Sequence, residues 1–416
     1  MQYRILQNTD RGGLKIDTYA GTVARPVDNA RVTVRPRGDS QKILEELVTD
    51  SSGQSPEIEL AAPPVEYSME PAEPMPYSEY DLDVTADGFE PVHIEGVQIL
   101  PDSTAIQPVY LKPIAGRNER ETIQIPRHVL WGEYPPKTPE EEVKPLPPAE
   151  NFVVLPNPVI PETIIVHAGA PANSSAPNYY VPFKDYIKNV ASCEIYATWP
   201  ESTLTANILA IVSFTLNRVY TEWYRGKGYP FTITNSTAYD HAFQYGRNIF
   251  EQISRVVDDV FSMYITRPNI RQPLLAQYCD GRKVSCPQWM TQWGSKSLGD
   301  QGWPAINILK NFYGWDIFLM NATRVEGVPQ SFTGSLQLGS SGTAVRTIQE
   351  QLNAVSKNYP LIPKLKADGI FGANTLSAVK TFQNVFNLPS TGIVNSATWY
   401  KISDIYVAVT RLGELK

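Results

Sequence analysis

A single carboxylic acid, Glu194, stands in the apolar stretch V-A-S-C-E-I-Y-A-T-W-P, which begins at Val190. Its neighbours Ile195 and Trp199 form a setting that favours the protonated form of a carboxylic acid near neutral pH. A protonated acid in this setting could act as a general acid toward an ether-type oxygen. The alternative is an ordinary carboxylate near a helix start, and spacing alone favours that alternative.

Cysteine and zinc chemistry is the next possibility. Cys193 directly precedes Glu194, but none of the histidines is close to it, which disfavours a cysteine hydrolase. The histidines are His93, His128, His167 and His241. With Cys279 and Cys286 the cysteines number three, too few for a disulfide framework, so we expect reduced thiols. Two alternatives stay open: a disulfide between Cys279 and Cys286, or a zinc site made by both with His241. We expect no cofactor.

Two helices should position Glu194. Thr198 and Glu201 have the spacing of a capping box, with Pro200 in the first turn, and an apolar stripe then predicts a helix over 199–224. A shorter apolar stripe over 183–190 places Glu194 near the junction of two helices. A further amphipathic helix is predicted over 246–264, and residues 164–166 indicate the first strand of this central part.

The length of 416 residues suggests about three domains. Residues 1–113 show short strands with alternating apolar and polar residues, which predicts an antiparallel β-sandwich. Residues 114–152 are rich in proline and acidic residues, and we expect an extended, exposed linker or propeptide. A short apolar run follows at a place that a protease could reach: Asn151, Phe152, Val153, Val154 and Leu155.

The central part, 153–330, interleaves aromatic, glycine and amide residues in a way that suits a carbohydrate groove. The candidates for contacting sugar are Gln292, Tyr278, Asp240 and Trp293, although core packing is the alternative for Trp293. The last part, 331–416, predicts two short helices joined through a turn that needs glycines with positive φ. That turn contains Asp368, Gly369, Phe371 and Gly372.

Charge and hydropathy exclude some functions. The net charge is −7 without a basic run, which argues against a nucleic-acid partner. The sequence contains no stretch of 18 or more apolar residues, so it predicts no membrane-spanning helix. The N-terminal residues lack the apolar core of a signal peptide, so we expect synthesis in a cytosol.

Residues 336–402 resemble the PG-binding-1 family of peptidoglycan-binding domains. The pattern is G-x-x-G, V-x-x-L-Q, D-G-x-F-G and T-x-x-A-V-x-x-F-Q, closed by T-W; Ile348 and Asn395 are departures from it. The resemblance implies a small helical domain with peptidoglycan as its partner.

Residues 164–320 are similar to the SpoIID/LytB domain. One signature appears as V-A-S-C-E-I-Y-A-T-W-P-E-S-T-L-T-A-N-I, and a second as T-Q-W-G-S-K-S-L-G-D-Q-G-W-P-A-I-N-I-L-K-N-F-Y-G. Val212 stands where the family has an arginine. The resemblance implies an α+β catalytic domain of a lytic transglycosylase, with Glu194 as its acid and Gln292 in the second signature. With this resemblance, catalysis becomes the favoured interpretation of Glu194, ahead of an ordinary carboxylate near a helix start.

The order of the parts resembles that of clostridial spore cortex-lytic enzymes. That resemblance implies a zymogen, made in the mother cell without a signal peptide, stored in the spore and activated at germination by a subtilisin-like Csp protease. Its substrate would be the spore cortex peptidoglycan. Two alternatives stay open: a wall-binding activator of an amidase that is not itself catalytic, and a peptidoglycan amidase.

Overall fold

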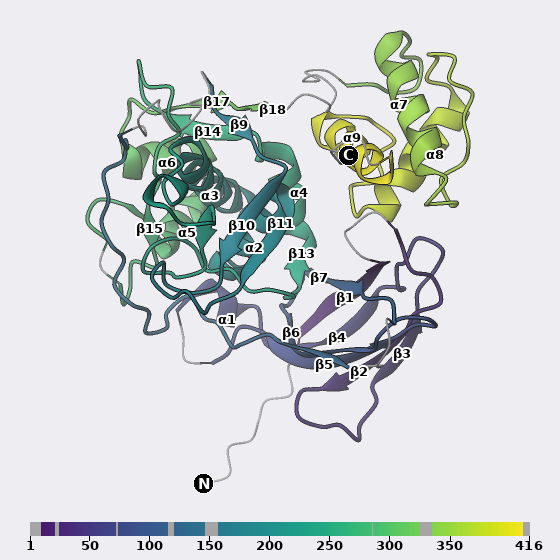
Figure 1. The fold of residues 1–416 in the computed structure, drawn as a ribbon, viewed down its shortest axis with the longest axis horizontal. Coiled ribbons are helices and arrows are strands. Elements are labelled where there is room, and N and C mark those ends of the chain that lie inside the picture. Colours follow the sequence, from purple (N-terminus) through teal and green to yellow (C-terminus); the bar gives the residue numbers. More distant parts are fainter. Residues whose placement is uncertain are drawn as a thin grey trace.

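The computed structural model describes residues 10–20, 25–71, 74–114, 120–145, 157–284, 286–324 and 335–410. Three parts follow one another along the chain: a β-rich part, a central part of mixed helices and short strands, and a C-terminal helical part (Figure 1). The protein is thus multidomain, with mixed sheets and helices, as predicted. Among the described residues, no helix is both long enough and apolar enough to cross a membrane.

Two sheets form the β-rich part. The first has the order β13-β7-β1-β4 and the second β3-β2-β5-β6-β8. The strands of the first are β1 (Asp10–Ala20), β4 (Ile58–Ala62), β7 (Thr104–Leu111) and β13 (Ile249–Phe250). Those of the second are β2 (Arg31–Pro36), β3 (Glu45–Val48), β5 (Ser78–Thr85), β6 (Val92–Ile99) and β8 (Glu121–Gln124). The short helix α1 (Glu66–Met69) follows β4 and contacts the central part, where the Ser68 carbonyl accepts from Trp199 Nε1 at 2.9 Å. Alternate residues such as Ile16, Val34 and Leu82 are fully buried between the sheets, as the alternating pattern predicted.

The prediction that the sandwich is purely antiparallel was wrong. Strand β1 pairs with β7 in parallel, and β6 pairs with β8 in parallel. Alternation of apolar and polar residues predicts which face of a strand is buried, but it carries no information on which strand lies next to it or in which direction. Parallel pairing here joins strands that are distant in sequence.

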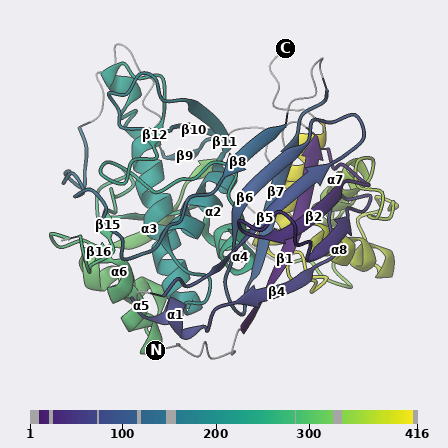
Figure 2. The same cartoon turned by 90° about the horizontal axis from the view of Figure 1, so that it is seen from below.

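The central part is built around α3 (Glu201–Tyr220), most of whose side chains are buried. Helices α2 (Phe183–Glu194), α4 (Glu251–Val260), α5 (Gln292–Asp300) and α6 (Ala305–Tyr313) pack around it. Its strands are short: β9 (Val159–Ile160), β10 (Thr163–His167), β11 (Asn178–Pro182), β12 (Ile233–Thr234), β14 (Met263–Thr266), β15 (Tyr278–Cys279), β16 (Met290–Thr291), β17 (Phe318–Asn321) and β18 (Thr323–Arg324), with a 3-10 turn at Arg225–Lys227. The view in Figure 2 shows α3 between α2 and the α5–α6 pair.

Glu194 is the last residue of α2, so its predicted place at a helix junction is confirmed. The predicted capping box was wrong, because α3 begins at Glu201 with Pro200 at its N-cap and without a side-chain cap. The Thr198 hydroxyl lies instead 2.8 Å from the Ser68 hydroxyl, a contact with the β-rich part. Tertiary packing has replaced the local hydrogen bond that the sequence pattern predicted.

The helix predicted over 246–264 is shorter than expected. It is reduced to α4, because Ile249 and Phe250 pair with Ile106 and Ala105 of β7, and residues 263–266 form β14. The central part thereby contributes a strand to the first sheet of the β-rich part. The two parts are held together by backbone hydrogen bonds as well as by side-chain packing.

The expectation that residues 114–152 form an exposed linker or propeptide was wrong in part: many of the described residues are exposed, but the segment packs against the rest of the protein. Strand β8 lies in this segment, and Ile125, Leu130 and Lys144 are buried. Side chains of the central part replace the hydrogen bonds of a regular element: the Gln272 carboxamide, for example, accepts from the Lys144 N–H at 2.6 Å and donates to the Lys144 carbonyl at 3.0 Å. After β8 the segment packs without regular structure, which no composition rule predicts.

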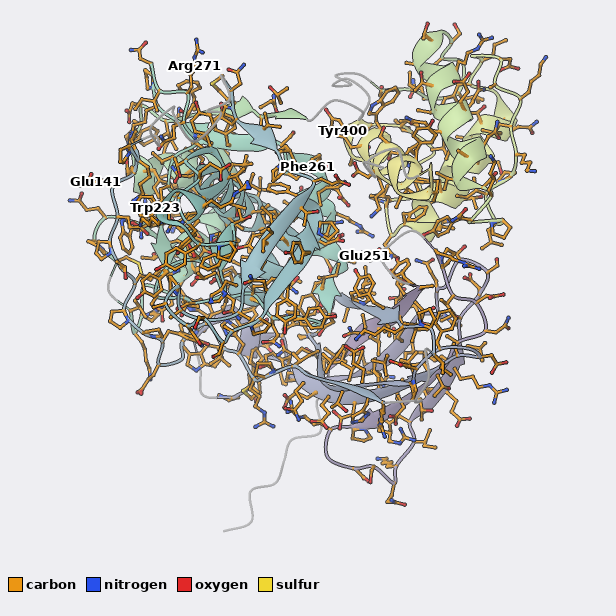
Figure 3. The ribbon with its side chains drawn as sticks, in the orientation of Figure 1. Glu141, Trp223, Glu251, Phe261, Arg271 and Tyr400 are labelled. Carbon is orange, nitrogen blue, oxygen red and sulfur yellow. A yellow bond between two sulfur atoms is a disulfide. The ribbon has the colours of Figure 1, made fainter. Side chains whose placement is uncertain are left out.

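The C-terminal part has its own core and consists of α7 (Thr343–Val355), α8 (Ala373–Val385) and α9 (Ser396–Thr410). The first two helices were predicted, and α9 was not. Gly369 has the expected positive φ of +76°, whereas Gly372 has φ −90° and does not need to be glycine for that reason. Tyr400 of α9 packs edge-on against Phe261 beside α4, with ring centroids 5.6 Å apart (Figure 3).

Candidate active site around Glu194

Glu194 is 7% exposed at the C-terminal end of α2, and each carboxylate oxygen has a donor. The backbone N–H of Ala242 donates to Oε1 at 2.7 Å, and the Gln292 amide donates to Oε2 at 2.8 Å. No ion pair to Glu194 forms among the residues that the structure describes. The carboxyl group is therefore held in one orientation by neutral donors.

Gln292 reaches Glu194 because of a small parallel pairing. Strands β15 and β16 pair Tyr278 with Met290 and Cys279 with Thr291, so Gln292, the next residue and the first of α5, begins its helix beside this pair. Gln292 thus lies beside Glu194, and its predicted contact with sugar stays a prediction.

The loop that carries Ala242 is fixed by Asp240, whose side chain is fully buried. Its Oδ1 accepts from Arg218 Nε at 2.8 Å, and its Oδ2 accepts from the Tyr224 hydroxyl and the Thr234 N–H. All of these partners are protein groups. This geometry fits a supporting role for Asp240 better than the predicted contact with sugar.

Tyr278 and His241 lie side by side behind the carboxylate, with their rings stacked at 5.7 Å. Burial, reinforced by the charge of nearby Glu194, raises the pKa of Tyr278 well above its usual value, so its hydroxyl keeps its proton. Burial and the charges of Lys137 and Arg218 hold the pKa of His241 well below its usual value, so the ring is neutral. The Tyr278 hydroxyl and His241 Nε2 are buried without a well-formed hydrogen bond in the described residues. Both groups could therefore form a hydrogen bond to another molecule near Glu194.

Cys279 and Cys286 form a disulfide, so the expectation of reduced thiols was wrong for this pair. The bond also contradicts the zinc alternative with His241, because both sulfur atoms are already bonded. Within the described ranges, no group of three or more His, Cys, Asp or Glu side chains could hold a metal ion. Cys193 is a buried thiol whose pKa is raised by burial, which makes it a poor nucleophile.

Trp293 is a core residue. It is 5% exposed, lies 5.0 Å from the Trp199 ring, and donates from Nε1 to the Leu130 carbonyl at 3.0 Å. Core packing, the alternative considered for it, is what the structure shows. The contact also ties the proline-rich segment to the site, because Leu130 belongs to that segment.

We call residues 125–145 the covering segment, because part of it lies over Glu194. A pocket beside the carboxylate is lined on one side by this segment, through His128, Leu130, Tyr134, Pro135 and Lys137. The other side is formed by Glu194, Thr237, Cys279, Asp280, Val284 and Gln292. Its volume of about 40 Å³ admits a few water molecules at most, so a disaccharide does not fit.

Lys137 is the cation of the covering segment that lies nearest the site. Its Nζ donates to the Asp240 carbonyl at 3.0 Å and lies 4.7 Å from the centre of the Tyr278 ring. Burial lowers the pKa of Lys137, while the charges of Glu194 and Asp240 raise it. Further along, Glu140 accepts a hydrogen bond at 2.6 Å from the fully buried Arg218. The segment is therefore anchored by charge as well as by packing.

The sequence did not reveal the Ala242 N–H or the covering residues His128, Tyr134 and Lys137. One signal is present in the sequence: polar residues such as Asn189 lie next to the apolar stripe of α2. The structure buries Asn189, and buried polar side chains usually have a specific hydrogen-bonding role. Asn189 accepts from the Gln244 N–H at 3.0 Å and so helps to hold the loop that carries Ala242. The predicted cleavage region, 151–155, lies outside the described residues.

Residues 341–402 match the model of a putative peptidoglycan binding domain, so the C-terminal part of the chain is a member of that family. Over 73 residues, 17% of this chain, the sequence is 40% identical to the zinc D-Ala-D-Ala carboxypeptidase of Streptomyces albus G. The match spans about a quarter, 27%, of that enzyme.

Two solved structures are also similar to parts of the chain. The SleB N-terminal domain shares 28% identity with a TM-score of 0.16, over 18% of this chain and 99% of that domain. The minor pilin GBS52 of Streptococcus agalactiae shares 18% identity with a TM-score of 0.18, over 26% of this chain and 47% of the pilin. At these TM-scores the two likenesses carry no argument about function.

Proposed function

We propose that this chain is a peptidoglycan lytic transglycosylase of the spore cortex, with a SpoIID-like catalytic domain over 153–330 and Glu194 as its acid. In domain order it resembles the clostridial spore cortex-lytic enzyme SleC. The observation that carries the proposal is the geometry of Glu194: a buried carboxyl group that neutral donors hold at a pocket. The C-terminal domain of the peptidoglycan-binding family supplies the substrate class.

One carboxyl group is sufficient for this reaction. Glu194 gives its proton to the oxygen that links muramic acid C1 to the next sugar, and that bond breaks. The C6 hydroxyl of the same muramic acid bonds to C1, and its proton goes to Glu194, so the product is a 1,6-anhydro sugar and no water is consumed. Asp280 also lines the pocket, but it accepts hydrogen bonds from the N–H groups of Arg282 and Val284 in its own turn. Asp280 thus shapes its own turn, whereas the donors of Glu194 come from two other segments, the loop of Ala242 and α5, which hold the Glu194 carboxyl group at the pocket.

The position of the covering segment over the pocket supports the proposal that the intact chain is a zymogen. While it lies in place, the pocket is too small for two sugars, so the intact chain should have little activity. Cleavage in the region 151–155 by a subtilisin-like Csp protease at germination would free the C-terminal end of the segment. The segment could then leave the pocket by breaking its non-covalent contacts with the central part, since its remaining covalent connection is to the β-rich part.

The test uses a chain with an engineered protease site in 151–155, cut and then given cortex peptidoglycan. Glu194→Gln should reduce the release of anhydro-ended muropeptides, measured by mass spectrometry, by about a hundredfold or more. Glu201→Gln is the matched control, because Glu201 is an exposed carboxylate at the start of α3. Anhydro product from Glu194→Gln at the rate of the parent protein would refute the role of Glu194.

A further inference from the structure

The C-terminal domain contains an internal repeat that is visible in its hydrogen bonds. The buried Gln349 of α7 donates from its amide to Asp368, to the Ile370 carbonyl and to the Thr375 hydroxyl, and accepts from the Gly369 N–H. The buried Gln383 of α8 makes the same set: its amide donates to Thr391, to the Ile393 carbonyl and to the Thr398 hydroxyl, and it accepts from the Gly392 N–H. Two equivalent turns, 368–371 and 391–394, are thus held by two equivalent glutamines.

Each turn presents an aliphatic side chain to solvent. Ile370 is 59% exposed and Ile393 is 37% exposed, while the next residue of each turn, Phe371 or Val394, is buried. Exposure of a large aliphatic side chain at the same place in both turns is not required by the core. The exposed aliphatic side chain is therefore a surface feature that both halves of the repeat share.

Each turn also has a cation beside it. Arg346 of α7 packs against Gly369, and Lys380 of α8 packs against Gly392: a methyl group added to these glycines would lie 3.6 Å and 3.0 Å from the two side chains. Both cations are exposed, and neither forms an ion pair in the part of the chain that the structure describes. The two halves thus present the same pair of groups, one aliphatic and one positively charged.

The segment before α7 joins the two turns into one surface. Leu336 exchanges backbone hydrogen bonds with Val394 of one turn, and Ser340 accepts from the Phe371 N–H of the other. Leu338 lies between these contacts and is 59% exposed. We call Leu338, Ile370, Ile393, Arg346 and Lys380 the two-turn patch.

The two-turn patch is separate from the face that docks on the rest of the protein. Docking uses Val385, whose carbonyl accepts from Gln54 at 2.6 Å, together with Asn387 and Tyr400. Val385 ends α8, whereas the turn 368–371 precedes its first residue, so the length of the helix, about 20 Å, separates that turn from the docking contact. The turn 391–394 lies closer to Val385 in the chain, but Ile393 and Lys380 are exposed while the domain is docked. The patch is open while the domain is docked.

We propose that the two-turn patch binds the peptide stems of peptidoglycan, one stem to each turn. An aliphatic side chain next to a cation is complementary to a methyl group next to a carboxylate, which is the chemistry of an alanine-containing acidic peptide. Glycan chains are recognised mainly by exposed aromatic rings, and the aromatic residues of this domain that are described, such as Phe371 and Trp399, are buried or half-buried. Two sites on one rigid domain raise the affinity for a wall that carries many stems.

The inference deepens the proposed function, but it is tested without catalysis. The full chain carrying Glu194→Gln is mixed with insoluble peptidoglycan, either intact or stripped of stems by an amidase, and the bound fraction is measured as a function of peptidoglycan concentration. We expect Ile370→Asp and Ile393→Asp each to weaken binding to intact wall about tenfold, and the double variant to weaken it about a hundredfold. Arg346→Glu and Lys380→Glu should each weaken it as well.

Leu361→Asp is the matched control, because Leu361 is a 50% exposed aliphatic residue of the same domain that belongs to neither turn. It should bind as the parent does. Equal binding to stripped and intact wall would make the glycan the ligand and overturn the proposal, as would unchanged binding by the double variant. Thermal unfolding shows that each variant is folded, since changes at exposed positions alter stability little. Release of anhydro-ended muropeptides by the cut Glu194→Gln chain at the rate of the parent protein, with these binding results unchanged, would count against the role of Glu194 alone.

Discussion

The side-chain amide of Gln292 donates to Glu194 twice, to the backbone carbonyl at 2.7 Å and to Oε2 at 2.8 Å. Glu194 ends α2, so its carbonyl has no partner within that helix. One side chain therefore satisfies the end of α2 and orients the carboxylate. The position of the proposed acid depends on α5, which is distant in sequence and brought close by the β15–β16 pair.

Replacing Gln292 should therefore affect activity and stability together. In the cut protein, Gln292→Ala should lower the rate of anhydro-muropeptide release by about tenfold or more, because Oε2 loses its donor. The free energy of unfolding should fall by about 1–3 kcal/mol, since a buried carboxylate and a buried carbonyl lose their partner. Gln301→Ala is the control, because the Gln301 amide contacts only the exposed end of α5. A variant with normal rate and normal unfolding would contradict this role.

The covering segment should hold the intact chain in a low-activity state through Lys137. Lys137→Ala removes the hydrogen bond to the Asp240 carbonyl and the contact with the Tyr278 ring. A charged hydrogen bond is worth about 1.5–3 kcal/mol, so the open fraction, and the activity of the uncut chain, should rise about tenfold or more. Glu133→Ala is the control in the same segment, since its side chain is 92% exposed. If the uncut Lys137→Ala chain were no more active than its parent, Lys137 would not be holding the pocket closed.

Parts of this architecture follow from local sequence, and other parts do not. The junction at Glu194, the strand over 164–166, helices α7 and α8 and the positive φ of Gly369 are local features, and they were predicted correctly. The shortening of the helix over 246–264 comes from pairing with β7, and the burial of Leu130 comes from Trp293. Both depend on contacts between residues far apart in sequence. The covering of Glu194 is the extreme case, because a proline-rich composition indicates an exposed chain.

The disulfide between Cys279 and Cys286 should stabilise one wall of the pocket. The disulfide closes the loop 279–286. Cys279 and Val284 belong to this loop, and both line the pocket. Closing so short a loop is worth about 2–3 kcal/mol in the chain-entropy model. Replacing both cysteines with serine should lower the melting temperature and weaken substrate binding, seen as a higher KM with little change in kcat. Reductant should have the same effect on the parent protein and none on the variant. If reductant still lowered the melting temperature of the variant, the disulfide would not be the cause of the effect. Cys193 would not explain it either, because it is a buried thiol outside the disulfide.

Asp17, at the contact with the C-terminal domain, should make the stability of the folded protein depend on pH. Burial raises the pKa of Asp17 from 3.8 to about 6, although Gln54, Lys401, Lys15 and Tyr19 favour its charged form. Asn387 of the C-terminal domain donates to the same carboxylate at 3.3 Å. Between about pH 4 and pH 6 the folded protein thus holds a proton that the unfolded chain has released. The free energy of unfolding should therefore fall as the pH rises through 6, by at most about 3 kcal/mol.

The comparison of the parent protein with Asp17→Asn isolates this effect. His128, whose pKa is lowered to about 4 by burial and by Arg247, acts in the opposite direction over the same pH range, but it is present in both proteins. Asparagine stays neutral at every pH and can still hydrogen-bond. The melting temperature of the parent relative to the variant should therefore decrease from pH 5 to pH 7.5. Parallel curves for the two proteins would contradict a pKa of Asp17 that is raised in the folded protein.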